Sequence, residues 1–526
     1  MASSPDTIIS EIINAFYGGI SADRGIQQLE TFGISQHFDT FSSPQKMTPY
    51  RAMEEDQNTS YEIIKVLYAN SNVFGFGVVS GSGKVEVYKK NSDPITGSWA
   101  QMTHGADAGG ARFKNCFLSF HNYAYGGAAG TRIWACDLTD VAAFTSTAYS
   151  GAGEPVCNGI VTTDDFLIIP CASGIARKDG AGSGPTSNWS TFSIVPSSHT
   201  PVDICEIGDI VAIFAKPASG SLGVNSKIFL WDKVSQDPSQ VIDLGNGDVV
   251  IGDEIEGELV AVIQVGGGTT FSIDPKLVVR SWSGGSKAQV AIEIPADSGT
   301  STLSILGNHT KVKDGNKVIF GLSITLDGAS YTQLATLGRK TPVYPLALTL
   351  DRLVDNDTAL TGSIQGVGKA GDYIWVGHNG DGSLNRTNDQ AVYTNATAVY
   401  ISQKVNGETR VRDAARRKKV LKSAGILCEK LTSGQSVSLY YRTDGATSWT
   451  LIRTYAYGDD ALESPAIVPG NVGFEAGVAD VNGDGTSLLD FVNYHECQFK
   501  ATATGGAEIM GIPYSWQFAG SEVSSV

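Results

Sequence analysis

The sequence predicts a mainly β fold: a β-propeller of about seven blades, with an N-terminal extended arm before it and a C-terminal β-sandwich after it. Three observations lead to this prediction. A phrase made of an apolar strand, a glycine-rich turn and a second strand recurs along most of the chain. Glycine makes up 61 of the 526 residues, more than the roughly 7% of ordinary proteins. Beyond Val405 the rhythm of the strands changes.

Residues 1–60 are expected to form the arm. Apolar residues fall at helical spacing near its start, which predicts one short amphipathic helix from Ile8, Ile9, Ile12, Ile13 and Phe16. Asp6 and Glu11 interrupt this stretch and no basic segment precedes it, so we expect no secretory signal. Gln27–Tyr50 shows no clear periodicity, and we expect it to become ordered against neighbouring subunits.

Residues 61–407 are expected to form the propeller. Copies of the repeated phrase begin 44 to 58 residues apart, at Val73, Phe117, Phe166, Ile210, Val260, Val318 and Tyr373. A period of this size with several short strands per copy is typical of propeller blades, whose sheets cover one another's faces. The runs FLII, IVAIF and VIFGL are apolar throughout, as expected of inner strands that are buried on both faces. Several stacked β-sandwich domains remain the alternative, because they would give similar strand spacing.

Residues 408–526 are expected to form the C-terminal β-sandwich domain. Six or more alternating segments follow one another here within about a hundred residues, including QSVSLYYRTDG and FVNYHECQFKATA.

The overall charge disfavours broad nucleic-acid binding. The chain has 38 Lys and Arg against 54 Asp and Glu, for a formal net charge of -16, whereas nucleic-acid binding needs a basic surface. No run of eighteen apolar residues occurs, so no membrane-spanning helix is expected. The seven cysteines form no C-x-x-C pair, and we expect mostly reduced, buried thiols.

One basic segment interrupts this acidic chain. Its positive residues are Arg410, Arg412, Arg416, Arg417, Lys418 and Lys419. Such a cluster could bind an acidic partner subunit, so these six are our candidate partner-binding residues. The alternative, a solvated linker of like charges between two domains, remains open.

One segment has partial calcium-loop spacing. Asp480, Asn482 and Asp484 occupy the first, third and fifth positions of such a loop, and they are our candidate metal ligands. The twelfth position, which should carry a bidentate carboxylate, is Phe491. A turn rich in Asp, Asn and Gly also forms without a metal. We therefore expect no cofactor, with calcium possible only at this loop.

Enzymatic motifs are weak in this sequence, and we name no catalytic residue. SDPITGSW and TDGATSW come near the Asp-box of sialidases through Asp93 with Trp99 and Asp444 with Trp449, but their Gly spacing differs. GSGK at Gly81–Lys84 lacks the spacing of a phosphate-binding loop and predicts a hairpin turn. Neither G-x-S-x-G nor H-E-x-x-H occurs in the sequence.

Two regions resemble a known group of proteins. Phe16–Tyr50 (FYGGISADRGIQQLETFGISQHFDTFSSPQKMTPY) and Val66–Val79 (VLYANSNVFGFGVV) resemble the start of propeller-type structural proteins of tailed bacteriophages. Ser433–Ile452 and His495–Trp516 resemble the β-sandwich that closes such virion proteins. The resemblance implies an early arm, a propeller and a terminal β-domain in one virion tail or tail-associated subunit. It transfers no catalytic residue.

We therefore expect a non-enzymatic structural protein of a tailed-bacteriophage virion, assembled in the host cytoplasm. Its expected partners are other virion subunits, including further copies of the chain, with no nucleic acid and no membrane insertion. Two alternatives stay open. One is an adhesin that binds a host surface glycan, and the other is a sialidase-like glycoside hydrolase on a propeller scaffold.

Overall fold

The structure is a computed structural model of the chain. It describes residues 8–20, 32–41, 45–50, 53–58, 62–78, 85–90, 97–102, 113–128, 132–139, 144–180, 184–219, 224–266, 275–296, 303–326, 328–339, 343–352, 364–378, 383–387, 397–408, 410–457 and 493–519. Within these ranges no helix has the length and apolar character needed to cross a membrane.

The chain divides into two compact units. The propeller unit consists of Met53–Ala335 and Val354–Asn388. The segmented unit consists of Met1–Ala52, Thr336–Leu353 and Asp389–Val526.

Consecutive strands of the propeller unit pair into antiparallel sheets. The first two sheets are β6 (Glu62–Ala69), β7 (Asn72–Val78), β8 (Val85–Lys90), β9 (Trp99–Gln101), and β10 (Phe113–Phe120), β11 (Tyr123–Ala128), β12 (Arg132–Asp137), β13 (Phe144–Tyr149). The next two are β14 (Ile160–Val161), β15 (Phe166–Cys171), β16 (Gly174–Asp179), β17 (Trp189–Phe192), and β18 (His199–Ile207), β19 (Ile210–Pro217), β20 (Ser226–Trp231), β21 (Gln240–Gly245). They are followed by β22 (Asp248–Ile255), β23 (Glu258–Val265), β24 (Lys276–Trp282), β25 (Gln289–Pro295), and then by β26 (Leu303–Asp314), β27 (Lys317–Leu326), β28 (Ala329–Gly338).

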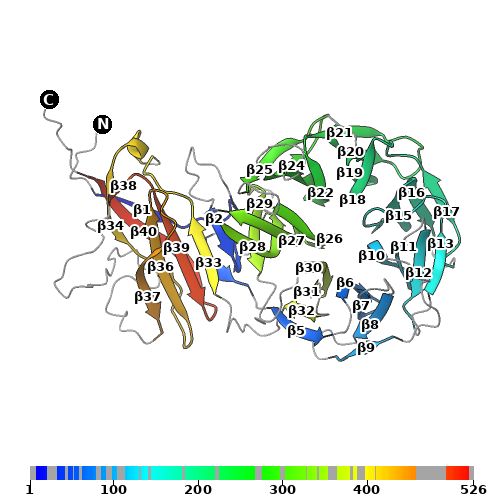
Figure 1. Ribbon diagram of the computed structural model, residues 1–526, viewed down its shortest axis with the longest axis horizontal. Coiled ribbons are helices and arrows are strands. Elements are labelled where there is room, and N and C mark those ends of the chain that lie inside the picture. Colours follow the sequence, from blue (N-terminus) through cyan, green and yellow to red (C-terminus); the bar gives the residue numbers. More distant parts are fainter. Residues whose placement is uncertain are drawn as a thin grey trace. The chain divides into compact units, whose positions relative to one another are not determined.

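The last sheet of the propeller unit joins the two ends of its sequence. Its strands are β30 (Ile364–Ala370), β31 (Tyr373–His378), β32 (Ser383–Thr387) and β5 (Met53–Asn58). The outermost strand β5 comes from the start of the unit and pairs with β32 in the register Leu384↔Gln57 and Arg386↔Glu54. Figure 1 shows the sheets around a common centre, with β10, β18 and β26 inside and β13, β17 and β21 on the rim. The predicted β-propeller is therefore confirmed.

The sequence prediction misplaced the innermost strands by one position. The apolar runs FLII, IVAIF and VIFGL lie in β15, β19 and β27, each of which is the second strand of its sheet. These strands are almost continuously buried, as predicted, because neighbouring sheets cover both faces. The innermost strands are β14, β18 and β26, and the last two also carry polar residues that face the centre of the ring.

Glycines have two roles in the propeller unit, in hairpin turns and at close contacts between strands. Four hairpins between first and second strands turn at a glycine with positive φ, namely Gly208, Gly257, Gly315 and Gly371. On the inner strand β30, Gly366 and Gly368 lie against the backbone of β6. A Cβ atom at Gly366 would lie 2.1 Å from the carbonyl oxygen of Ile64, so a larger residue would force the two strands apart.

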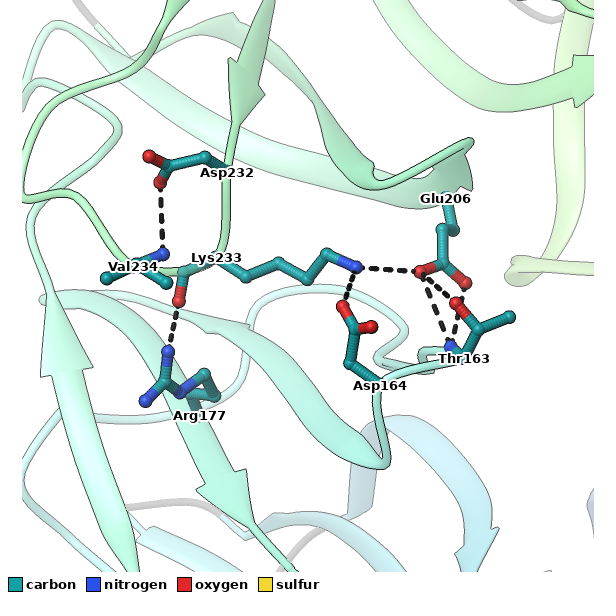
Figure 2. A network of polar contacts seen from close by, with 7 residues as sticks. All are labelled: Thr163, Asp164, Arg177, Glu206, Asp232, Lys233 and Val234. Atoms are coloured by element: carbon teal, nitrogen blue, oxygen red, sulfur yellow. Dashed lines mark hydrogen bonds and ion pairs between the residues drawn. The ribbon is translucent and has the colours of Figure 1, made fainter.

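Ionic groups also link neighbouring sheets, as Figure 2 shows. The buried Lys233, which follows β20, pairs with Asp164 from the β14–β15 hairpin and with Glu206 on β18, the latter at 3.1 Å. Glu206 accepts the backbone N–H of Thr163, and Arg177 on β16 donates to the carbonyl oxygen of Lys233. Burial opposes the charged form of Lys233, but the hydrogen bonds that it donates to Asp164 and Glu206 outweigh burial and raise its pKa. The cluster thus ties one sheet to the next.

The segmented unit contains two larger sheets. One has the order β1 (Ile9–Ile13), β40 (Ile509–Phe518), β34 (Lys419–Ala424), β38 (Asn493–Tyr494), with β35 (Leu427–Cys428) also paired to β40. The other has the order β29 (Ala347–Arg352), β2 (Phe32–Gln36), β33 (Ala398–Ser402), β39 (Cys497–Thr504), β36 (Ser436–Thr443), β37 (Thr450–Ala456). A small pair, β3 (Phe38–Asp39) and β4 (Thr48–Pro49), and one 3₁₀ turn, η1 (Ala414–Arg416), complete the described elements.

The predicted N-terminal helix is wrong. Ile9–Ile13 form strand β1, which pairs antiparallel with β40 in the register Ile9↔Trp516. Isoleucine is β-branched and favours strands, and the spacing of these apolar residues is compatible with either structure until a partner strand is known. The described part of Gln27–Tyr50 is likewise built into this chain's own sheets, and Phe32 and Phe38 are fully buried.

Aromatic side chains connect the two sheets of the segmented unit. Phe499 on β39 and Tyr514 on β40 lie 5.1 Å apart between ring centroids, and Phe16 meets Tyr400 at 5.4 Å. The buried Glu11 accepts a hydrogen bond from the indole N–H of Trp516 at 2.8 Å. The six cysteines among the described residues are free and buried, as the sequence predicted: Cys136, Cys157, Cys171, Cys205, Cys428 and Cys497.

Candidate functional site

The predicted metal site cannot be compared with the structure. Asp480, Asn482 and Asp484 lie outside the described residues, as does Gly81–Lys84. Among the residues that the structure does describe, no group of three or more His, Cys, Asp or Glu side chains could hold a metal ion.

The predicted basic segment is a compact turn in the segmented unit, and we call residues 410–419 the basic turn. Backbone N–H groups of Arg410 and Val411 both donate to the carbonyl oxygen of Gly407. Gly407 has a φ of +79°, and a Cβ atom there would lie 2.5 Å from the ring of Trp516. The turn thus begins at a position that only glycine fits, directly against the core.

Two of the six predicted residues support the turn. Lys419 is fully buried on β34, and its Nζ donates to the carbonyl oxygens of Ala414 at 2.7 Å and Arg417 at 2.8 Å. Burial lowers the pKa of Lys419 to about 8. The Arg417 guanidinium lies 3.4 Å from the ring centroid of Phe518. The sequence predicted that Lys419 would bind a partner. This prediction is wrong, because the charge of Lys419 is buried inside the turn.

The other four predicted residues project from this support. Arg410, Arg412, Arg416 and Lys418 are all exposed. Across the described ranges, no ion pair joins any of these four side chains to a carboxylate. An anionic partner would reduce the repulsion between these like charges. Because the turn is already ordered, little conformational entropy would be lost on binding.

An acidic cavity lies beside the basic turn. It has a volume of about 360 Å³ and is lined by Asn406, Ala415, Asp444, His495 and Glu496. The carboxylate of Asp444 accepts the backbone N–H groups of His495 at 2.8 Å and Glu496 at 3.0 Å. Asp444 therefore orders a turn. Trp449, its partner in the predicted Asp-box, contacts Arg442 and Lys500 through its ring. The resemblance of TDGATSW to a sialidase box gains no support from this geometry.

A second cavity lies at the centre of the propeller unit. Its volume is about 310 Å³, and it is lined by residues of the innermost strands β6, β14, β18, β26 and β30. Four lysines contribute to its wall: Lys65, Lys311, Lys313 and Lys369. We call this the axial cavity.

The deepest charges of the axial cavity neutralise each other. Lys311 on β26 lies 2.9 Å from Asp203 on β18 and 3.0 Å from Asp253 on β22. Asp203 is fully buried and also accepts the backbone N–H groups of Ile204 and Gly252, each at 2.9 Å. Burial raises the pKa of Asp203, and Lys311 opposes that change. Burial disfavours the charged form of Lys311, but attraction by Asp203 and Asp253 outweighs it and raises the pKa.

The remaining lysines of the axial cavity also contact acceptors of their own chain. Lys313 pairs with Glu254 at 2.5 Å, and Lys369 pairs with Asp314 at 2.6 Å. Lys65 donates to the carbonyl oxygen of Val367 at 3.3 Å. This cavity therefore links the inner strands of several sheets by ion pairs.

A third ionic cluster closes the ring. Asp56 on β5 accepts bonds from Lys90 on β8 at 2.6 and 2.7 Å, from Arg386 on β32 at 2.8 Å, and from the indole N–H of Trp99. Lys90 is only 1% exposed, and Arg386 also pairs with Glu54 at 2.9 Å. One carboxylate thereby joins the first sheet of the unit to the last.

Sequence reasoning located the basic turn but missed these clusters. Asp203 stands inside the apolar strand HTPVDICEI, where a lone carboxylate signals a buried partner. The identity of that partner, Lys311, depends on which strands meet at the centre of the ring, and no local pattern carries that information.

Comparisons with known proteins bear on the fold alone. No protein-family model matches the chain, and no curated protein sequence matches it. Similar solved structures include the computationally designed Ika8 protein, at 11% identity and a TM-score of 0.38, covering 64% of this chain and 99% of that one. The WD40 beta propeller domain of Doa1 has 13% identity and a TM-score of 0.38, with coverages of 65% and 97%. YCF48 bound to D1 peptide has 11% identity and a TM-score of 0.42, with coverages of 65% and 96%.

Proposed function

We propose that this protein is a non-enzymatic structural subunit of a tailed-bacteriophage virion, located in the tail or associated with it. The support comes from the resemblance of its N-terminal and C-terminal stretches to such subunits and from the character of its charged clusters. In the propeller unit, the ionic groups described above contact one another and hold sheets together. That use of charge suits a rigid assembly component.

The proposal includes a finer description of the fold. We count seven blades: five sheets of four consecutive strands from β6 to β25, a sixth begun by β26–β28, and a seventh made of β30–β32 with β5. The two sheets of the segmented unit would form the β-sandwich. In this description most of the terminal domain comes from residues after Asp389, with β1 and β2 added from the N-terminal segment.

The observation that carries the proposal is the basic turn. Four of its exposed cations, Arg410, Arg412, Arg416 and Lys418, are displayed on a backbone that the buried Lys419 holds in place. The chain as a whole has a formal charge of -16. A local, preordered positive surface on such a chain suits docking to an acidic surface, either of a different virion subunit or of another copy of this protein.

The direct test is to look for the protein in virions. Phage particles would be purified from a lysate of cells carrying the gene, and their proteins identified by mass spectrometry, with immunogold electron microscopy to locate this chain. We expect a constant copy number per particle and labelling at the tail. Absence of the protein from intact, infectious particles would overturn the proposal.

A complementation experiment tests the role of the basic turn. A phage that lacks the gene would be supplied with the wild-type protein or with R410Q/R412Q/R416Q/K418Q. We expect the wild-type protein to enter particles and the fourfold variant to be excluded while remaining folded. A matched control is K276Q, which removes an exposed lysine that pairs with Glu293 in the propeller unit. Equal incorporation of all three proteins would show that the basic turn is not the docking surface.

A further inference from the structure

Five Asn–Gly dipeptides occur in the sequence, and the structure describes three of them: Asn158–Gly159, Asn246–Gly247 and Asn406–Gly407. The other two, Asn379–Gly380 and Asn482–Gly483, lie outside the described residues. An asparagine followed by glycine is chemically labile, because glycine has no Cβ to shield its backbone nitrogen from the asparagine side chain. Attack of that nitrogen on the side-chain amide gives a cyclic succinimide. Its rate in a folded chain depends on how the structure holds the two groups.

Asn246 is the exposed one among the three described asparagines, whereas Asn158 and Asn406 are half-buried. It lies in the connection between β21 and β22, which joins the fourth and fifth sheets of the propeller unit. The backbone N–H of Gly247 donates to Oδ1 of Asn246 at 2.9 Å. The nitrogen that would attack is therefore already in contact with the amide, and its hydrogen bond polarises the amide carbonyl.

The backbone beside Asn246 is fixed by a neighbouring side chain. Ser226 donates from Oγ to the carbonyl oxygen of Gly247 at 2.6 Å, and the same Oγ accepts the backbone N–H of Val249 at 3.1 Å. The serine thus holds the chain on the far side of the dipeptide. Because Gly247 is already ordered next to the exposed amide, little further order would be lost on the way to the succinimide.

Asn406 is held in a different way. Its Oδ1 accepts the backbone N–H of Glu408 at 3.0 Å. The buried Gly407 also accepts the backbone N–H groups of Arg410 and Val411 with its carbonyl oxygen. Attack by the nitrogen of Gly407 therefore competes with the hydrogen bond to Glu408 and requires the turn to open.

Asn158 is hindered by packing. It lies in the wall of the axial cavity. Gly159 fits so closely against β15 that a Cβ atom there would lie 2.7 Å from the carbonyl oxygen of Ile168. The backbone of this dipeptide has little room to turn, so the structure favours reaction at Asn246 over the other two described asparagines.

We propose that Asn246 is a site of spontaneous deamidation. The nitrogen of Gly247 forms a bond to Cγ of Asn246, the bond from Cγ to Nδ2 breaks, and the displaced nitrogen takes up the Gly247 N–H proton and leaves as ammonia. Water then opens the succinimide at either carbonyl. One opening gives aspartate, and the other gives isoaspartate, in which the main chain runs through the former side chain. Nothing is oxidised or reduced, and this proposal does not depend on a virion role.

The isoaspartate product would disturb the joint between the two sheets. It lengthens the backbone by one carbon in a turn where Gly247 has a φ of +106° and a Cβ atom would lie 2.7 Å from Ile263 and 2.8 Å from Val265. Little space remains for the longer chain, so the contact of Ser226 with Gly247 would be lost. Aspartate at position 246 keeps the normal backbone and adds only an exposed charge. Isoaspartate, but not aspartate, should therefore destabilise the propeller unit.

Incubation of the purified full chain at mildly alkaline pH, followed by tryptic digestion and mass spectrometry, tests the proposal. The tryptic peptides 133–177, 234–276 and 405–410 each contain a single asparagine, so Asn158, Asn246 and Asn406 are measured separately. Unincubated protein gives the starting value. We expect Asn246 to convert about tenfold faster than the other two in the folded protein. In urea the three should convert at similar rates, because no structure then distinguishes them.

Two variants serve as matched controls. N246Q lengthens the side chain and cannot form the five-membered succinimide, so its peptide should gain no acidic product. N246D carries the charge of the product on a normal backbone and should unfold at the same temperature as fresh wild-type protein. The isoaspartate fraction, separated by ion exchange and identified by labelling with an isoaspartate methyltransferase, should unfold at a lower temperature.

Several results would overturn the proposal. Conversion of Asn246 in the folded protein that is no faster than that of Asn158 or Asn406 would show that the structure does not favour this site. Conversion in urea with none in the folded chain would show that the structure protects it. An isoaspartate fraction as stable as N246D would contradict the expected effect on the turn.

Discussion

The axial cavity of the propeller unit and the basic turn of the segmented unit are both rich in cations, but they hold them differently. In the axial cavity, Lys311, Lys313 and Lys369 each pair with a carboxylate of their own chain. On the basic turn, four exposed cations have no such partner among the described residues. Solvent accounts for this difference at Lys311, which is largely withdrawn from water: a buried charge needs a counter-charge or hydrogen-bond acceptors from the protein, and an exposed one does not. Exposed cations that are solvated by water and not paired with a carboxylate of their own chain are the ones available to a partner.

Lys419 is a third case, because it is fully buried and yet pairs with no carboxylate among the described residues. Its ammonium donates to two backbone carbonyl oxygens and lies over the ring of Tyr494. Its pKa falls to about 8 as a result of burial. The turn therefore depends on a cation that is costly to bury, whereas the axial cavity depends on charges that compensate one another.

The largest expected effect is at the closure of the ring. Asp56→Asn removes the negative charge that Lys90 and Arg386 share, so we expect a loss of about 3–5 kcal/mol in the free energy of unfolding of the propeller unit. Urea denaturation followed by tryptophan fluorescence measures it. As a control, Glu293→Gln breaks the exposed pair with Lys276 and should cost less than about 1 kcal/mol. Equal losses in both variants would show that the cluster does not close the ring.

A somewhat smaller loss is expected in the axial cavity. Asp203→Asn should destabilise the propeller unit by about 3 kcal/mol, at the lower end of the range for a broken buried pair, because Asp253 still faces Lys311. The double variant D203N/K311M should recover part of this loss, since it also removes the uncompensated cation. The same denaturation experiment tests both. Strictly additive losses would contradict the interpretation of Asp203 and Lys311 as a coupled pair.

The pH dependence of stability should report on Lys419. Below about pH 8 the residue is charged in both the folded and the unfolded chain, so the cost of its burial is fully present. Between about 8 and its ordinary value of 10.5 the unfolded chain binds the proton more tightly, so the stability of the wild-type protein rises with pH.

The measurement is the unfolding free energy of the wild-type protein minus that of K419M at several pH values. This difference should increase between pH 8 and pH 10, because the tyrosines that titrate at high pH are common to both proteins and cancel. K418M, at the exposed neighbour, serves as the control and should show no such trend. A flat difference for K419M would show that Lys419 keeps an ordinary pKa.

The smallest effect is expected at the surface of the basic turn. Arg410→Gln, Arg412→Gln, Arg416→Gln and Lys418→Gln should each change the unfolding free energy by no more than about 0.5 kcal/mol, because exposed side chains lose little on replacement. Thermal unfolding of the four single variants measures this. A loss comparable to that of Asp203→Asn would mean that these cations support the fold instead of facing a partner.

Much of the fold could be predicted from local patterns. The recurrence of apolar strands and glycine turns predicted the propeller, but Gly208 and Gly371 turn hairpins that precede the predicted phrases at Ile210 and Tyr373. The prediction failed where the partner of a strand is remote in sequence. Ile9–Ile13 fit a helix by spacing alone, and only β40, some five hundred residues away, makes them a strand.

The candidate sites divide in the same way. The basic turn was visible as a run of cations, but the sequence did not distinguish Lys419, which is buried, from Lys418 beside it, which is exposed. The contact of Lys500 with the ring of Trp449 was not predicted, because the two residues are apart in sequence and meet only through the pairing of β36 with β39 and β37.

The sequence by itself determined the repeated strand-and-turn unit, the abundance of glycine, and the net charge of -16, because each depends on residues close together in the chain or on composition alone. The tertiary structure alone decided how the ring closes through β5 and which cations are neutralised internally. The physical reason is that burial sets both the cost of a charge and the choice of its partner. Burial is a property of the assembled sheets, and no short segment of sequence contains it.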